Sequence, residues 1–213
     1  MHQKEALEIF WRTGALLEGH FVLTSGRHSD KYANKDRIYP HTREVARLAW
    51  EIAVHFIPRQ PTIQTVVGPA MGGIILATWT AHHLEQTREG QNDIPVAAIY
   101  AEKEGDRFVF RRGYDEFVRN RRVLIVEDIL TTGGSVKKVA EAVREAGGKV
   151  VAVAALCNRG NLTAEALNVP ELYSLLELNF QSWEETACPL CRDGVAVDIK
   201  VGKGREFLAR QSK

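Results

Sequence analysis

The chain has 213 residues and a formal net charge of +1, and 45% of its residues are hydrophobic while 26% are charged. These values predict one globular domain with a full core, and they exclude a strong overall field for nucleic acid or membranes. No apolar run approaches the ~18 residues of a membrane-spanning helix, the N-terminus is polar, and three cysteines do not make a disulfide framework, so we expect a cytoplasmic protein.

The N-terminal segment is expected to form a helix, a strand-rich stretch and a second helix. Apolar residues at helical spacing predict the first helix over about residues 4–17. Residues 19–35 alternate loosely between apolar and polar, which indicates strand and turn. Residues 42–56 form another amphipathic pattern, with Thr42 as a candidate N-cap and a proline beyond the end of the helix.

The middle of the chain alternates short strands with helical segments. Residues 65–67 predict a strand that leads into a glycine-rich loop over 68–73. The apolar segment 74–86 predicts a helix. The polar residues 91–93 predict a turn, and residues 95–100 predict the next strand.

The same alternation continues toward the C-terminus. Residues 108–110 indicate a strand in a hairpin, and the apolar run 123–126 indicates a strand buried on both faces. The following helix has an apolar stripe over 136–143 and is closed by two glycines, and residues 150–156 predict another strand. Strands that alternate with helices imply parallel βαβ units, so the expected fold class is α/β with a mostly parallel central sheet flanked by helices.

The most informative segment runs from Glu127 to Ser135. Two adjacent carboxylates, Glu127 and Asp128, arrive where the strand is expected to end, which is where open α/β sheets bind ligands. The Thr/Gly/Ser loop 131–135 offers hydroxyl donors and close backbone approach, and the next helix adds unpaired N–H groups and the positive end of its dipole. The loop therefore predicts a phosphate site. The acids beside it would accept hydrogen bonds from a ribose diol or share a hydrated Mg²⁺, which describes a site for a phosphorylated sugar.

Two better-known phosphate motifs do not explain this segment. The sequence has no Gly-x4-Gly-Lys-Ser/Thr, so the loop is not a nucleotide P-loop. It also has no Gly-x-Gly-x-x-Gly between a strand and a helix, so a dinucleotide-binding fold has no fingerprint here. An ordinary strand, turn and helix with a polar turn is the alternative, and the paired acids argue against it.

The Glu127–Ser135 segment, with the strand before it, resembles the PRPP-binding motif of the type I phosphoribosyltransferases: a hydrophobic strand, two acids and a Thr/Gly-rich loop. Within that family the chain looks most like the orotate phosphoribosyltransferases. Leu23–Ser29 resembles their N-terminal Ser-Gly-Arg/Leu-x-Ser segment, Val67–Gly73 resembles their pyrophosphate loop, and Cys157–Arg159 lies where the family keeps an arginine for the orotate carboxylate. The similarity runs from about Leu16 to Arg159.

The resemblance implies a fold, an activity and partners. The fold would be the type I phosphoribosyltransferase fold in a single domain over 1–213, with residues 1–40 and the C-terminal tail contributing to a hood. The activity would be transfer of the 5-phosphoribosyl group from PRPP to N1 of orotate, which gives orotidine 5′-monophosphate and pyrophosphate. Mg²⁺ would be the cofactor, held mainly by PRPP with few direct protein ligands, and the enzyme would be a homodimer.

The resemblance also implies three sets of site residues. The catalytic residues would be Lys103, Glu127 and Asp128. The PRPP-binding residues would come from a basic loop and two strand ends: Gly72, Gly73, Lys103, Glu127, Asp128, Ile129, Leu130, Thr131, Thr132, Gly133, Gly134 and Ser135. The orotate-binding residues would be Arg27, Tyr32, Thr131 and Arg159. The guanidinium of Arg159 would bind the orotate carboxylate as a bidentate fork.

Two segments depart from the family pattern. In the basic loop, Glu102 occupies the position of an arginine, and a later lysine and histidine are missing. Arg107, Arg111 and Arg112 lie nearby and could supply the charge. In the pyrophosphate loop, Gly72 stands where many relatives carry a lysine, so backbone N–H groups would have to bind the anion.

These departures leave two alternatives open. A phosphoribosyltransferase for a purine base would have a hydrophobic base slot and no need for Arg159. A regulator that senses PRPP without catalysis would bind PRPP without turnover, and the missing loop cations are its best support. The near-neutral charge argues against the nucleic-acid surface that such a regulator usually adds.

The pair Cys188 and Cys191 has the spacing of zinc ligands. A structural zinc site needs four ligands, the sequence has no second cysteine pair, and Cys157 and the histidines are far away along the chain. A reduced thiol pair in a turn is therefore the expectation.

Overall fold

A computed structural model describes residues 3–58, 63–87 and 94–211. The chain divides into two compact units, each described by itself. The first unit comprises Met1–Leu7 and Tyr39–Leu178, and the second comprises Glu8–Ile38 and Asn179–Lys213. Helix α1, Gln3–Arg12, contains the boundary between them.

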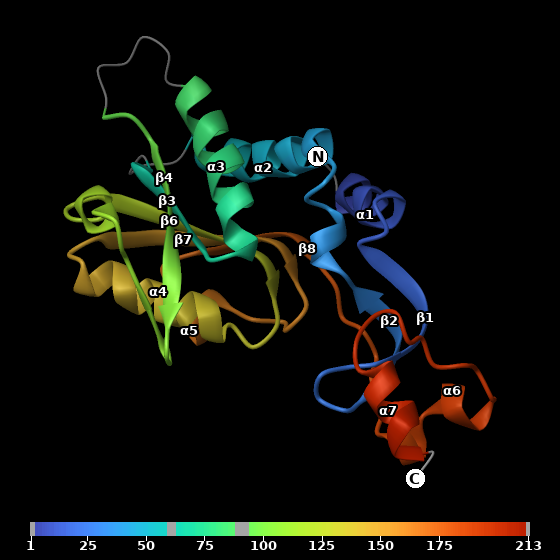
Figure 1. Cartoon of the computed structure of the whole chain (residues 1–213). Coiled ribbons are helices and arrows are strands. Elements are labelled where there is room, and N and C mark those ends of the chain that lie inside the picture. The colour runs from blue at the N-terminus through green and yellow to red at the C-terminus, as the bar shows by residue number, and fades with distance from the viewer. Residues whose placement is uncertain (1–2, 59–62, 88–93, 212–213) are drawn as a thin grey trace. The chain divides into compact units, whose positions relative to one another are not determined.

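The first unit is built on a six-stranded sheet with the order β5-β4-β3-β6-β7-β8 (Figure 1). All neighbouring strands are parallel except β4 and β5, which form an antiparallel hairpin. The strands are β3 (Thr65–Pro69), β4 (Ala97–Glu104), β5 (Arg107–Val109), β6 (Arg122–Leu130), β7 (Lys149–Asn158) and β8 (Leu172–Glu177). This arrangement confirms the predicted α/β class with a mostly parallel sheet.

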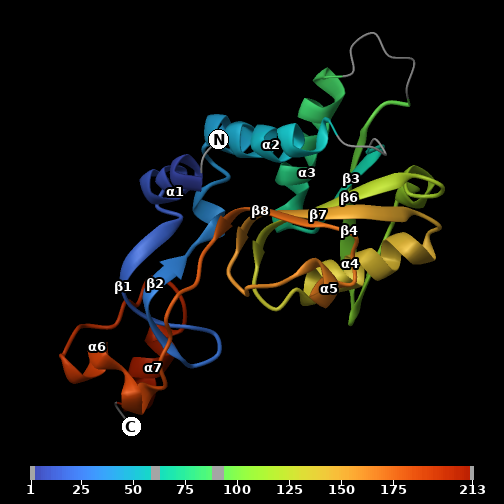
Figure 2. The same cartoon turned by 180° about the vertical axis from the view of Figure 1, so that it is seen from behind.

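Helices cover both faces of this sheet. Helices α2 and α3 lie on one face and α4 and α5 on the other, as Figures 1 and 2 show from opposite sides. The helices are α2 (Thr42–Phe56), α3 (Gly72–Gln86), α4 (Gly134–Glu145) and α5 (Ala164–Leu167). Because β6 is covered on both faces, its apolar run from Val123 to Val126 is fully buried. The valine stripe of α4, which includes Val136, Val139 and Val143, packs into the same core.

The second unit contains an antiparallel pair of strands and the C-terminal helices. The strands are β1 (Leu16–Val22) and β2 (His28–Ala33), and the helices are α6 (Pro189–Arg192) and α7 (Gly204–Gln211). Residue His28 of β2 forms an isolated antiparallel bridge with Trp183, with backbone N–O distances of 2.8 and 2.9 Å. The hairpin is thereby joined to the C-terminal segment of the chain.

Several predicted boundaries need correction. The first helix ends at Arg12 rather than near residue 17, because Gly14 adopts a left-handed φ of 71° and β1 begins at Leu16. Thr42 is the first helical residue and His41 is the N-cap, without a side-chain capping bond. The turn predicted at residues 91–93 lies outside the described residues.

The cysteine pair has neighbours in the fold that its sequence spacing does not show. All three cysteines are free thiols, as expected. However, His20 and His28, which are far from Cys188 and Cys191 along the chain, lie close to them in the fold, and one ligand atom from each of the four residues lies within 4.8 Å of the others. Among the helices of the described residues, none is both long enough and apolar enough to span a bilayer.

Candidate active site at the carboxyl ends of β3, β6 and β7

The candidate site lies where three parallel strands end together. Strand β6 lies between β3 and β7, and the pairs Val67↔Ile125 and Leu130↔Asn158 set the register of the three strands. The segments that follow these strands therefore meet at one edge of the sheet, the edge at which open α/β sheets bind ligands. They are the start of α3, the loop before α4 and the turn that contains Arg159.

The loop after β6 forms the first part of the site. Residues 129–136 and Glu127 line a cavity of about 50 Å³, which is room for several water molecules or a small polyatomic anion. Gly133 caps α4 with a φ of 72°, and Thr132 Oγ1 accepts a long 3.4 Å hydrogen bond from the N–H of Gly134. Because the first-turn amides of a helix have no partner within the helix, they can bind an anion here.

Glycine is required at position 133 for two reasons. Its φ of 72° is strained for other residues, and a Cβ there would lie 2.4 Å from Cδ2 of Leu167 and 2.9 Å from Cδ1 of Leu162. The loop is therefore packed closely on the segment around α5. This packing holds the amides at the start of α4 in a fixed position.

The turn after β7 is bound directly to the end of β6. The backbone N–H groups of Arg159 and Gly160 both donate to the Leu130 carbonyl oxygen, at 2.8 and 3.1 Å. A Cβ on Gly160 would lie only 1.8 Å from the Thr131 carbonyl oxygen, so the two backbones are in close contact. These contacts place the half-buried Arg159 next to the phosphate loop in the fold.

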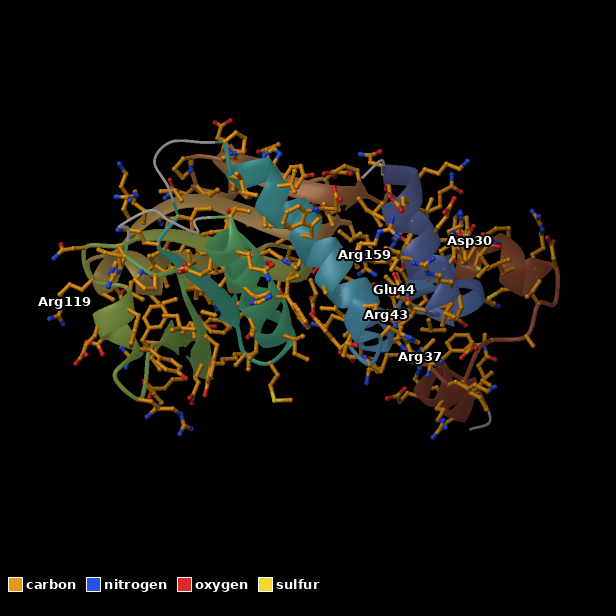
Figure 3. The ribbon with its side chains drawn as sticks, turned by 90° about the horizontal axis from the view of Figure 1, so that it is seen from above. Asp30, Arg37, Arg43, Glu44, Arg119 and Arg159 are labelled. Atoms are coloured by element: carbon orange, nitrogen blue, oxygen red, sulfur yellow. The ribbon has the colours of Figure 1, made fainter. Side chains whose placement is uncertain are left out.

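Figure 3 shows that Arg159 and Arg119 lie far apart. Arg159 follows the carboxyl end of β7, whereas Arg119 precedes the amino end of β6. Only the first of these arginines therefore belongs to the edge that carries the loops.

The two acids lie within β6 and not after it, because the strand continues to Leu130. Asp128 is 1% exposed and Glu127 is 8% exposed. Glu127 Oε1 accepts a hydrogen bond from the Asp128 N–H at 3.1 Å, and Asp128 Oδ1 accepts one from the Ile129 N–H at 2.7 Å. Glu127 lines the loop cavity, so its carboxylate can meet a ligand there, while Asp128 is held more deeply.

Sequence reasoning missed Tyr39. Its hydroxyl lies 3.0 Å from Oδ2 of Asp128 and also contacts the Gly72 carbonyl oxygen. Both neighbours are acceptors, so the single hydroxyl proton is shared between the acid pair and the start of α3. Tyr39 is separated from Asp128 by 89 residues, and no local pattern marks it as a site residue.

The predicted pyrophosphate loop, residues 67–73, comprises the end of β3, a short turn and the first two residues of α3, which begins at Gly72. A Cβ on Gly68 would lie 2.2 Å from the Gly73 carbonyl oxygen, and a Cβ on Gly73 would lie 2.7 Å from Cδ of Pro69. Both glycines are therefore needed for the sharp passage from β3 into α3. The first-turn amides of α3 are exposed to the same edge of the sheet as those of α4.

The basic loop that the resemblance implied around Lys103 belongs to a β-hairpin in this structure. Lys103 is exposed on β4 and pairs with Phe108 of β5. Glu104 binds Arg107 at 2.6 Å and also binds Arg111. The hydrogen bond and charge of Arg107 lower the pKa of Glu104.

Further charges of the hairpin are also paired. Arg112 Nε lies 3.3 Å from Glu102 Oε1, and Asp106 at the hairpin turn binds Lys138 of α4. The arginines expected to replace the missing loop cations are thus engaged with the glutamates of their own hairpin.

The remaining predicted orotate residues, Arg27 and Tyr32, belong to the second unit. Arg27 Nε donates to Ser182 Oγ at 2.9 Å, and its guanidinium also pairs with Glu184. The ring of Tyr32 packs against Phe21 with a centroid distance of 5.5 Å. Within this unit, both side chains contribute to contacts that hold β1, β2 and the C-terminal segment.

The acids fit a magnesium ion that is held mainly by its substrate. Mg²⁺ typically takes one or two protein carboxylates together with phosphate and water oxygens. Glu127 and Asp128 supply such a pair, and no third His, Cys, Asp or Glu joins them in a metal-ligating cluster among the described residues. The expectation that PRPP mainly holds this metal, with few direct protein ligands, stays a prediction.

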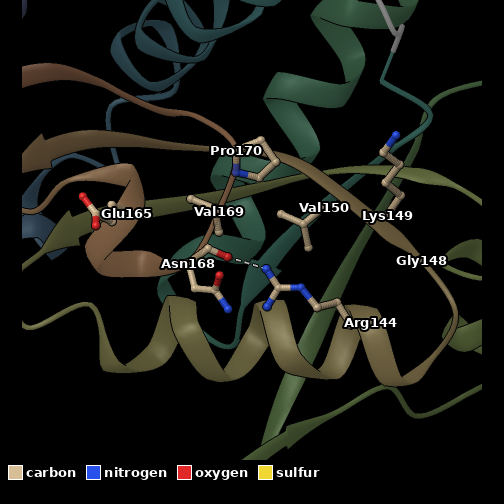
Figure 4. Close-up of a pocket in the computed structure, with 8 residues that line it drawn as sticks. All are labelled: Arg144, Gly148, Lys149, Val150, Glu165, Asn168, Val169 and Pro170. Carbon is tan, nitrogen blue, oxygen red and sulfur yellow. Dashed lines mark hydrogen bonds between the residues drawn. The ribbon is translucent and has the colours of Figure 1, made fainter.

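A larger cavity of about 520 Å³ lies elsewhere in the first unit (Figure 4). It is lined by residues near the amino end of β7, including Lys149 and Val150, and by Arg144, which donates to the Asn168 carbonyl oxygen. Because it opens beside the amino end of β7, this cavity is not at the edge that carries the phosphate loop.

Comparison with known proteins gives three kinds of similarity. The family of the phosphoribosyl transferase domain matches residues 34–186. The orotate phosphoribosyltransferase of Chlorobium phaeobacteroides is 36% identical over 198 residues, which cover 93% of this chain and 95% of that protein. The enzyme of the same name from Caldanaerobacter subterraneus is 37% identical over 202 residues, covering 95% and 98%.

A solved structure of an orotate phosphoribosyltransferase is also similar to this chain, at lower sequence identity. Mycobacterium tuberculosis orotate phosphoribosyltransferase in complex with inorganic phosphate has a TM-score of 0.61 and 27% identity to this chain. The alignment covers 83% of this chain and 95% of that structure.

Proposed function

The chain belongs to the phosphoribosyl transferase domain family, and on that basis we propose that it transfers the 5-phosphoribosyl group of PRPP to N1 of orotate. The products are orotidine 5′-monophosphate and pyrophosphate. The observation that carries the substrate assignment is the similarity to orotate phosphoribosyltransferases, at 36–37% identity over more than nine-tenths of both chains.

The loop after β6 binds the 5′-phosphate in this proposal. Residues 131–135 contribute hydroxyl groups and the first amides of α4, and the cavity that they line supports this role. Glu127 and Asp128 hold the ribose hydroxyls and favour the positive charge that develops on the ring as pyrophosphate leaves. Bound Mg²⁺ would neutralise charge on the departing pyrophosphate, and these two acids are the residues that would hold it.

The leaving group is bound by cations and amides. Gly72 and Gly73 offer backbone N–H groups at the start of α3, which supports a pyrophosphate site without a lysine in that loop. Lys103 accompanies pyrophosphate and stabilises its charge. Its exposed position on the hairpin supports access to a bound ligand.

Orotate is held by Arg159 and Thr131 of the first unit in this proposal. Arg159 binds the orotate carboxylate through a bidentate fork, and its attachment to the end of β6 supports this assignment. Orotate is already an anion at neutral pH, so the transfer needs no strong general base. The proposed working form is a cytoplasmic homodimer, which rests on the family resemblance.

An absorbance assay tests the substrate. Orotate is supplied with PRPP and Mg²⁺, and adenine, guanine, hypoxanthine and uracil are run in parallel. We expect consumption of orotate only. Turnover of a purine instead would favour the purine-base enzyme, and PRPP binding without turnover of any base would favour the sensor.

The variant Arg159→Ala tests whether Arg159 binds orotate, and its PRPP affinity and thermal unfolding show whether the fold is intact. We expect it to reduce kcat/KM for orotate by about a hundredfold or more, because a charge-assisted bidentate pair is lost. Its affinity for PRPP and its thermal unfolding should stay close to those of the parent protein. Arg159→Lys keeps the charge without the fork and should recover only part of the activity.

A further inference from the structure

Four metal-ligating side chains meet in the second unit, in a place that the proposed transfer reaction does not use. They are His20 of β1, His28 of β2, and Cys188 and Cys191 at the start of α6. One ligand atom from each lies within 4.8 Å of the other three. The residues come from sequence segments that are up to 171 positions apart, so the fold itself assembles the cluster.

Three nitrogen–sulfur distances within the cluster are close to those of a tetrahedral site. His20 Nε2 lies 3.7 Å from both cysteine sulfurs, and His28 Nδ1 lies 3.3 Å from Cys191 Sγ and 2.8 Å from His20 Nε2. A tetrahedral zinc site with normal bond lengths has edges of about 3.3 Å between nitrogens, about 3.5 Å between nitrogen and sulfur and about 3.8 Å between sulfurs. The two nitrogens are about 0.5 Å closer than this edge and would have to separate when a metal binds.

The hydrogen bond of His20 directs its lone pair into the cluster. Nδ1 of His20 lies 2.7 Å from the Val195 carbonyl oxygen, which can only accept, so Nδ1 carries the proton. Nε2 therefore presents its lone pair to His28 and the two sulfurs. A metal-bound histidine typically donates its second ring N–H in this way, which fixes both its tautomer and its orientation.

The cluster is shielded from solvent. His20, His28 and Cys188 are 2%, 0% and 3% exposed, and Phe207 of α7 meets the His28 ring edge-on at 4.8 Å. Cys191 is half-buried. Because a divalent cation deprotonates a coordinating thiol outright, metal binding would release protons that can be measured.

The location of the cluster explains what a metal would do. It joins both strands of a two-stranded hairpin to the C-terminal segment, and such a hairpin alone is marginally stable in water. The second unit is also smaller than the roughly 70–80 residues below which domains usually need a metal or disulfides for stability. Its free cysteines form no disulfide that could take this role.

We propose that His20, His28, Cys188 and Cys191 bind one structural zinc ion. All four positions are filled by protein side chains, as in closed structural sites, so the ion would take no part in phosphoribosyl transfer. Two nitrogen and two sulfur ligands in a tetrahedron favour zinc over magnesium or calcium, which prefer oxygen. The proposed transfer reaction assigns no role to any of these four side chains.

Metal analysis of the full-length protein tests this proposal. The protein is produced with zinc in the medium, dialysed, and measured by mass spectrometry for zinc per chain. We expect about one zinc per chain, and its loss in Cys191→Ser and in His20→Ala. The matched control is Cys157→Ala, which removes the thiol outside the cluster and should keep the ion. A zinc content near zero in the parent protein, or zinc that persists in both cluster variants, would overturn the proposal.

A second measurement does not depend on whether a variant folds. The parent protein is stripped with a chelator and titrated with Co²⁺, which replaces zinc and reports its ligands by absorption. We expect tetrahedral visible bands with a thiolate charge-transfer band, release of protons on binding, and a higher thermal unfolding midpoint with metal than without. A stripped protein that binds Co²⁺ without thiolate absorption, or whose unfolding midpoint is unchanged by zinc, would contradict a structural Cys2His2 site.

Discussion

The hydroxyl oxygen of Tyr39 lies 3.0 Å from Oδ2 of Asp128, and the same hydroxyl contacts the Gly72 carbonyl oxygen. One side chain therefore connects the acid pair of β6 to the first turn of α3. In the proposed reaction, these two places hold the ribose and the pyrophosphate of the same substrate. Tyr39 is thus a positioning residue, which fixes Asp128 relative to α3.

Replacement of Tyr39 by phenylalanine tests this relationship. The ring is kept, but the buried Asp128 loses a hydrogen bond, and bonds to charged groups contribute about 1.5–3 kcal/mol. We expect kcat/KM for PRPP to fall by about ten- to a hundredfold, mainly through kcat, because the acid is mispositioned when ring charge develops. Steady-state kinetics with varied PRPP measure both constants.

Tyr114→Phe is the matched control for Tyr39→Phe. Tyr114 lies in the 3₁₀ helix before β6, and its ring meets Tyr100 edge-on at 5.2 Å, away from the acid pair. This variant should keep the kinetics of the parent protein. If Tyr39→Phe has the same kcat and the same KM as the control, Tyr39 does not position Asp128.

Gly160 is expected to tolerate no side chain. A Cβ there would meet the Thr131 carbonyl oxygen at 1.8 Å, so Gly160→Ala must push the turn after β7 away from the phosphate loop. Overpacking of this kind costs about 1–3 kcal/mol, which corresponds to a fall of roughly 2–12 °C in the unfolding midpoint of a chain of this size. Thermal unfolding followed by circular dichroism measures the shift.

Gly134→Ala provides the comparison for stability. Gly134 has an ordinary φ, and a Cβ there would have only Thr132 Oγ1 nearby, at 3.6 Å. Alanine also has a better helix propensity at the start of α4, so this variant should unfold at the parent temperature or slightly above it. Equal midpoints for the two variants would show that the turn after β7 can move freely.

The central part of the fold could be predicted because its signals are local. The apolar run 123–126, the glycines of the loop and the stripe of α4 each report the burial or backbone freedom of their own segment. Arg159 could be found in the same way, because it follows the next strand and adjacent parallel strands end at one edge. The family resemblance then supplied the chemistry of this edge.

The rest depends on contacts between distant segments, which periodicity does not report. Nothing near Tyr39 in the sequence indicates that its hydroxyl reaches Asp128. Cys188 and Cys191 show metal-ligand spacing, but their neighbours His20 and His28 become visible only when β1 and β2 pair and the C-terminal segment packs on them. Hydrogen bonds within the ladder likewise extend β6 through both acids, although charged residues are poor strand formers.

Cys157 is expected to be unreactive in the folded protein. It is fully buried on β7, and burial is the largest cause that raises the pKa of its thiol to about 12. At pH 8 only about one thiol in ten thousand is then the reactive thiolate, compared with roughly one in four for a free cysteine. Iodoacetamide labelling at pH 8, mapped by mass spectrometry, should leave Cys157 unmodified in the native protein and modify it in guanidinium chloride. Native labelling at the rate of free cysteine would show that the strand opens readily.

Lys103 is expected to be the cation of the β4–β5 hairpin that acts on the leaving group. Arg107, Arg111 and Arg112 are bound to two hairpin glutamates, so two of their three positive charges are compensated before substrate binds. Lys103→Ala should therefore lower kcat by about tenfold or more, because a charge that stabilises departing pyrophosphate is removed. The unfolding midpoint should change little, since Lys103 is exposed.

Lys149→Ala is the control for the loss of a lysine charge. Lys149 is also an exposed residue of the sheet, but it begins β7 and thus lies at the opposite end of the strands from the phosphate loop. Its variant should keep the parent kcat. If Lys103→Ala raises only the KM for PRPP and leaves kcat unchanged, the lysine binds ground state and transition state equally, and the catalytic role proposed for it would be wrong.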